Sequence, residues 1–71
     1  MNNVTGCQFQ ANGTRRVWFF RDNSQVVEYT TLPPKLRFKY WDAGNHQIRA
    51  KEQQVEMKKA IEQFKKLRGI K

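Results

Sequence analysis

The last third of the sequence predicts one long amphipathic helix, over about residues 46–68. Asn45 is a favourable N-cap residue, and Gly69 is well placed to end the helix in a left-handed conformation. Twenty-three residues would extend roughly 34 Å, which is long for a chain of 71 residues. Ile48 and Val55 are expected on the side opposite the apolar stripe. The stripe itself follows the 3.6-residue period and contains Ala50, Met57, Ala60, Ile61, Phe64 and Leu67. Such a stripe must pack against other residues, and the preceding residues, which alternate as strands do, are expected to form the sheet that it covers.

Alternating apolar and polar residues predict four strands before this helix. Asn12-Gly13 favours a two-residue type I′ turn, because both positions of that turn need positive φ. Pro33-Pro34 ends the third strand. The expected strands cover about 5–11, 14–21, 25–31 and 35–41. The fold class is therefore α+β: a four-stranded antiparallel meander followed by one C-terminal helix packed on one sheet face (ββββα), in a single domain over 1–71.

The alternation also predicts which side chains leave the core. Leu36, Phe38 and Tyr40 share one face of the fourth strand and are expected to face the helix. The opposite face then carries Lys35, Arg37, Lys39 and Trp41. If Val17 and Phe19 also point inward, the second strand presents Arg16, Trp18 and Phe20 outward. Cations interleaved with aromatic rings suit single-stranded nucleic acid, since rings stack on bases and cations neutralise phosphates.

Charge supports a polyanionic partner, either DNA or RNA. The net charge is +8, and the excess lies in residues 35–71, where eleven cations face four carboxylates. On the predicted helix, Lys51, Lys58 and Lys65 are seven residues apart on one flank and could follow a phosphate backbone. Glu62 lies within reach of Lys58, so an ordinary solvated face with internal ion pairs is the alternative.

We therefore expect a small basic nucleic-acid-binding protein of low sequence specificity. Its expected binding residues are Arg16, Trp18, Lys35, Arg37, Lys39, Trp41, Lys51, Lys58 and Lys65. The alternative is a protein-binding inhibitor or adaptor that uses the same basic aromatic face against an acidic surface of a host enzyme, because interfaces also enrich arginine and aromatic rings.

The sequence predicts no catalytic, metal or cofactor site. Cys7 is the one cysteine and alternates with Phe9 on the expected core face, and His46 is the one histidine. No apolar run is long enough to span a membrane, and the first ten residues lack a signal peptide's pattern, so we expect a cytoplasmic protein. Large aliphatic residues are few, at three Leu, three Ile and five Val, so a homodimer that supports the small core is a further expectation.

The expected order of elements resembles that of the dimeric single-strand-binding folds of the transcriptional coactivator and Whirly type. A three-stranded sheet with one helix also resembles the DNA-binding arm domains of phage integrases. Small basic chains of this kind also resemble phage-encoded inhibitors of host enzymes, and this resemblance supports the inhibitor alternative. The likeness is one of element order, with no matched residue motif.

Overall fold

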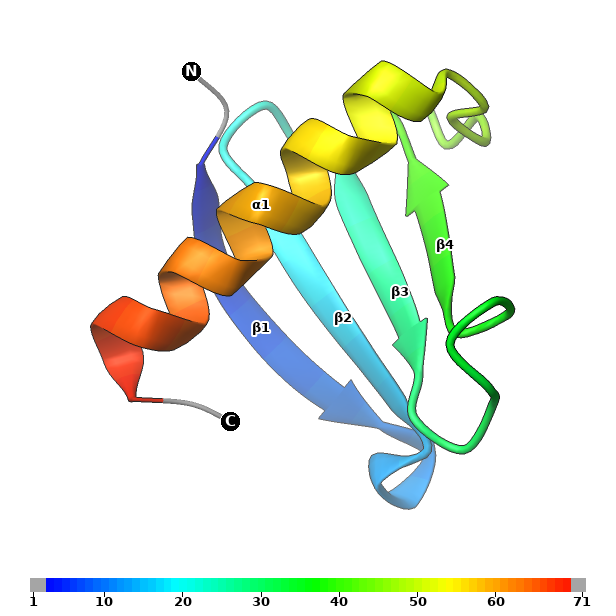
Figure 1. The fold of residues 1–71 in the computed structure, drawn as a ribbon, viewed down its shortest axis with the longest axis vertical. Coiled ribbons are helices and arrows are strands. Elements are labelled where there is room, and N and C mark those ends of the chain that lie inside the picture. The colour runs from blue at the N-terminus through cyan, green and yellow to red at the C-terminus, as the bar shows by residue number, and fades with distance from the viewer. Residues whose placement is uncertain (1–2, 70–71) are drawn as a thin grey trace.

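The structure, a computed structural model, describes residues 3–69. One open antiparallel sheet contains β1 (Val4–Gln10), β2 (Arg15–Phe20), β3 (Gln25–Tyr29) and β4 (Phe38–Trp41), in the order β1-β2-β3-β4. The helix α1 (Lys51–Arg68) lies diagonally across one face of this sheet, and the other face carries no helix (Figure 1). The predicted ββββα architecture is confirmed.

The connection between β1 and β2 is longer than the predicted two-residue turn. Gln10 pairs with Arg15, so four residues join the strands. The short 3₁₀ helix η1 (Ala11–Gly13) lies within this connection, and its three residues have φ values of 51°, 58° and 88°. Thr14 closes it by donating both its N–H and its Oγ1–H to the carbonyl of Ala11, at 3.2 Å and 2.7 Å. The Asn-Gly pair predicted positive φ correctly but not the loop length.

The fourth strand begins at Phe38, three residues later than expected. The Leu36 N–H donates to the Pro33 carbonyl at 2.9 Å, which folds the segment after the prolines into a turn. Leu36 is therefore exposed, and the prediction that it faces the helix is wrong. The Arg37 carbonyl accepts a hydrogen bond from the Tyr29 N–H at 2.6 Å, which extends the β3–β4 pairing by one residue.

The helix begins at Lys51 rather than near residue 46, because residues 42–48 fold back along β4. Asn45 is in a turn with φ 63° and does not cap α1. Ile48 donates its N–H to the Tyr40 carbonyl at 2.8 Å, and its side chain is buried in the core. The prediction that Ile48 lies opposite the apolar stripe is therefore wrong. Gly69 ends the helix at φ 67°, as predicted, and donates to two carbonyls of the last turn.

The core lies between α1 and the sheet. Trp18 is completely buried, with 0% of its surface exposed, and its ring packs edge-on against Phe64 with the centroids 5.9 Å apart. Cys7, Val26 and Tyr40 occupy the same cross-strand row as Trp18 and share its side of the sheet. The buried cluster contains Trp18, Phe20, Val26, Ile48, Met57 and Ile61. The prediction that Trp18 and Phe20 point outward is wrong.

Candidate nucleic-acid interface

The helix-free face of the sheet, here called the open face, consists of three cross-strand rows. Residues that are directly opposite in antiparallel strands share a face, so the register identifies each row. The first row is Gly6, Phe19, Gln25 and Trp41; the second is Gln8, Val17, Val27 and Lys39. The third is Gln10, Arg15 and Tyr29, which Arg37 continues through its backbone bond to Tyr29.

These rows combine rings with cations. Phe19 is 38% exposed, and the Trp41 and Tyr29 rings are half-buried. Arg15 and Lys39 are exposed, whereas Val17 and Val27 are buried beneath their longer neighbours. The three rows contain no carboxylate, so the positive charge on this face has no internal partner within the sheet.

Part of the predicted binding set gathers here. Lys39 and Trp41 lie in the rows, and Arg37 lies at the end of the third row. The Arg37 Nε also donates to the Leu32 carbonyl at 3.2 Å, which ties its side chain to the loop before β4. Lys35 is exposed in the turn that precedes the strand. Arg37, Lys39 and Trp41 therefore lie along the open side of β4, and Lys35 lies in its entry loop.

Arg16 and Trp18 lie on the opposite face, under the helix. The Arg16 guanidinium is between two rings, 4.7 Å from the Phe9 centroid and 5.0 Å from Trp18. Its Nε lies 3.8 Å from Glu28 Oε1, and the two side chains are only 12% and 7% exposed. Trp18 Nε1 donates to the same carboxylate oxygen at 3.3 Å. The expected outward placement of Arg16 is thus also wrong, because its side chain is enclosed beside Glu28.

The three helix lysines also lie on the helix side, away from the open face (Figure 1). Lys58 Nζ lies 5.0 Å from the Phe38 ring centroid. Lys65 Nζ lies 5.5 Å from the Trp18 ring and 3.9 Å from Glu62 Oε1, and only 17% of its side chain is exposed. Lys51 is exposed at the start of α1. The predicted set therefore divides between two surfaces of the molecule.

Sequence reasoning missed Arg15, Phe19 and Tyr29. The available signal was the opposite-charge pair Arg16 and Glu28, since charged residues directly opposite across two strands stabilise their pairing. That register places Arg16 and Glu28 together on one face and sends Arg15 and Tyr29 to the other.

One carboxylate lies just beyond the open face. Asp42 follows Trp41, and its Oδ1 accepts the N–H groups of His46 and Gly44, both at 2.9 Å. The bond from the His46 N–H is the main reason that the pKa of Asp42 lies below its ordinary value, and the Gly44 N–H acts in the same direction. This carboxylate holds the turn after β4.

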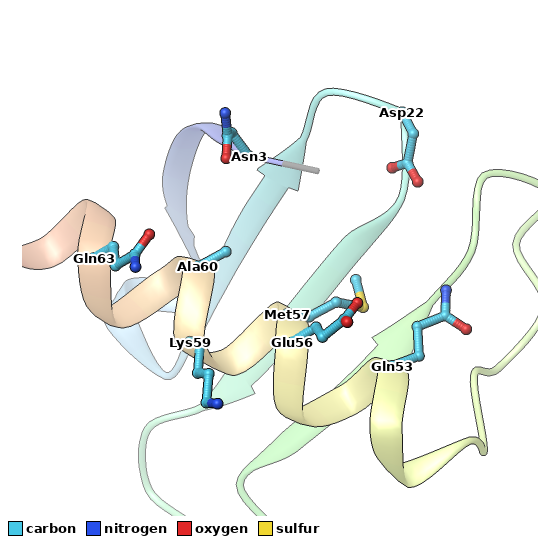
Figure 2. A pocket seen from close by; sticks show the side chains of 8 residues that line it. All are labelled: Asn3, Asp22, Gln53, Glu56, Met57, Lys59, Ala60 and Gln63. Carbon is cyan, nitrogen blue, oxygen red and sulfur yellow. The ribbon is translucent and has the colours of Figure 1, made fainter. Parts of the chain in front are cut away.

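A groove of about 470 Å³ lies between α1 and the start of β1 (Figure 2). Met57 points into it, and Lys59 is directed away from Asn3 and Asp22. Asp22 Oδ1 accepts the Ser24 N–H at 2.9 Å and so serves the β2–β3 turn. The remaining lining residues are Gln53, Glu56, Ala60 and Gln63. Two carboxylates and no aromatic ring make this groove a poorer match for a polyanion than the open face.

Within 3–69, no three His, Cys, Asp or Glu side chains converge as metal ligands would. Cys7 lies on β1 and His46 beyond β4, at the two edges of the sheet, so they form no pair. The described part of the chain contains no helix with the length and apolar character needed to cross a membrane. Comparison with protein-family models, curated proteins and solved structures finds no match.

Proposed function

We propose that this protein binds single-stranded nucleic acid on the open face, with low sequence specificity. The observation that carries the proposal is the three-row arrangement: three rings and three cations on a helix-free sheet surface whose rows hold no carboxylate. A flat surface of this kind favours contacts with phosphates and base faces over contacts with base edges in a groove.

The expected mechanism follows from the positions of the side chains. Phe19 and Trp41 lie in one row on alternate strands, with Gln25 between them, so their backbones are about 10 Å apart. Two bases could stack on these rings, at about 1–3 kcal/mol each. Lys39 lies in the second row and Arg15 in the third, where they would neutralise phosphates.

The central experiment compares two double variants by measuring affinity for a single-stranded oligonucleotide against salt. Replacing Arg15 and Lys39 by Ala should reduce the slope of log affinity against log salt by about 1.4, since each neutralised phosphate contributes about 0.7. Replacing Lys51 and Lys66 by Ala removes the same charge from exposed positions on α1 and should leave the slope nearly unchanged. Equal slopes for the two double variants would overturn the assignment to the open face.

Tryptophan fluorescence tests the stacking role separately, because the two tryptophans lie on opposite faces. Trp18 is completely buried, so quenching by an oligonucleotide should come from Trp41 and disappear in Trp41→Phe. Quenching that persists in Trp41→Phe would contradict stacking on Trp41.

A protein partner with an acidic surface is the alternative occupant of the same face. Electrostatic attraction would make that interaction salt-sensitive as well, so salt dependence alone does not separate the two. Capture from a nuclease-treated lysate does. A stoichiometric protein that remains bound, together with no affinity for oligonucleotides, would replace the nucleic-acid proposal with an inhibitor or adaptor role.

A further inference from the structure

The outer edge of β1 is a bare sheet edge. In antiparallel pairs, successive residues direct their backbone N–H and C=O groups alternately to the two sides of the strand. Thr30 donates to Thr14, and Phe20 to Ser24, so the even-numbered residues of β2 bond β3. The odd-numbered residues of β2 therefore bond Gly6, Gln8 and Gln10 on β1. It follows that Cys7 and Phe9 direct their backbone groups away from the sheet, where residues 3–69 place no backbone partner.

The opposite edge of the sheet is covered over the second half of β4. The outward carbonyl of Tyr40 accepts the Ile48 N–H at 2.8 Å, and the Asp42 N–H donates to the His46 carbonyl at 2.9 Å. Gln47 pairs with Trp41 between these two bonds. The segment after β4 therefore acts as a short fifth strand, and β1 is the edge at which another strand can be added.

The composition of β1 also favours pairing. Its seven residues, VTGCQFQ, contain no charge and no proline in a chain of net charge +8. Charges and prolines are the usual means by which proteins protect an edge strand. A β-bulge between Val4 and Gly6 interrupts the start of the strand and leaves 6–10 as the regular part.

The helix extends beyond the sheet at this edge. Figure 1 shows the last turn of α1 passing over β1 and ending on its outer side. Leu67 continues the sheet-facing stripe of Ala60 and Phe64, yet it is 86% exposed. Phe9, on the helix side of β1, is 57% exposed. The sheet is thus one strand narrower than the apolar surface that is available to cover it.

We propose that a second copy of this chain pairs antiparallel with β1 through residues 6–10, with Gln8 at the two-fold axis. Cys7 then lies opposite Phe9 of the second copy, and this hydrogen-bonded pair occurs twice, once on each side of the axis, so the outward N–H and C=O groups of both residues gain partners. The added strand extends the sheet beneath Leu67 and covers Phe9. A second copy fits this edge because residues 6–10 are uncharged and self-complementary about Gln8, so the two paired strands of these basic chains meet without a cation between them.

The dimer is independent of nucleic-acid binding, and salt separates the two. Salt screens the repulsion between two +8 chains, so dimerisation should strengthen as salt rises. Oligonucleotide affinity should fall over the same range. Measuring the oligomeric state without nucleic acid therefore tests this proposal alone.

The first test is sedimentation equilibrium on two matched variants. Leu67→Lys places a charge at the pairing edge and should weaken the dimer roughly tenfold or more, since a Leu side chain would no longer be buried. Val55→Lys adds the same charge at an outer helix position that is 52% exposed and should leave the dimer intact. A wild-type monomer up to millimolar concentration, or equal dimerisation of the two variants, would overturn the proposal.

The second test fixes the register by disulfide formation in a Cys7→Ser background. Gln8→Cys would place two cysteines at a non-hydrogen-bonded pair, with Cα atoms about 4.5 Å apart, within the range of a disulfide. Gln10→Cys is the control, because its two copies would lie roughly 14 Å apart. Oxidation should link the first variant and leave the second unlinked, and the reverse result would reject this pairing.

Discussion

The two faces of the sheet use the same kinds of residue in opposite ways. On the helix face, Arg16 lies between the Phe9 and Trp18 rings and beside the Glu28 carboxylate. On the open face, Arg15 is exposed in a row that contains no acid. Adjacent arginines on one strand thus have different surroundings because the pleat directs them to opposite sides.

This difference shows why charge and aromatic content alone do not locate a binding surface. A buried cation depends on its carboxylate and rings, so removing one of these partners destabilises the fold, whereas exposed cations without carboxylates remain available to a binding partner. Substitutions on the helix face should therefore reduce stability, whereas those on the open face should reduce binding.

The largest stability difference is expected between the two tryptophans. Trp18→Ala removes a fully buried ring that packs on Phe64, and should lower the free energy of unfolding by about 3–5 kcal/mol. Trp41→Ala removes a half-buried ring and should cost about 1 kcal/mol. Urea unfolding followed by circular dichroism measures both, and similar losses would contradict the distinction between the faces.

A smaller loss is expected from the buried ion pair. Glu28→Gln keeps an amide oxygen for Trp18 Nε1 but leaves the Arg16 guanidinium enclosed without its carboxylate, at a cost of about 3 kcal/mol. Replacing both Arg16 and Glu28 by Leu should restore most of this stability, because no buried charge remains. Lys39→Ala on the open face is the comparison and should change stability by less than about 0.5 kcal/mol. A double variant less stable than Glu28→Gln would argue against this account of the pair.

The smallest expected effect concerns pH and the turn after β4. The His46 and Gly44 N–H groups hold the pKa of Asp42 below its ordinary value of 3.8. A lowered folded pKa contributes stability that is present above pH 3.8 and is lost as pH falls through the folded pKa. The Asp42→Asn variant lacks this carboxyl group, so its free energy of unfolding should fall less than that of the unsubstituted protein as the pH decreases below 3.8. Unfolding curves of the two proteins between neutral pH and pH 3 make the comparison, and parallel pH profiles would exclude this role for Asp42.

The order of elements was predictable, since turn residues and the change from a two-residue to a 3.6-residue period mark each element. The orientation of β2 was not predictable, because both of its faces carry apolar residues. Val17 and Phe19 lie on one face, and Trp18 and Phe20 lie on the other. Only pairing with β1 and β3 decides which face the helix covers. The alternation of β4 sets Lys39 and Trp41 opposite Phe38 and Tyr40, so these two residues were placed correctly, whereas the ambiguity of β2 is why Arg15 was missed.

The covered edge at β4 also sets how far the sheet can grow. Strand-to-strand assembly continues into a fibril only when each added molecule presents a new edge. Here Gln47 and Ile48 occupy the second half of the β4 edge, so in the proposed dimer, where β1 is paired, only the start of β4 is left open. If the dimer forms as proposed, residues 42–48, which delay the start of α1, would also hinder further strand addition at β4.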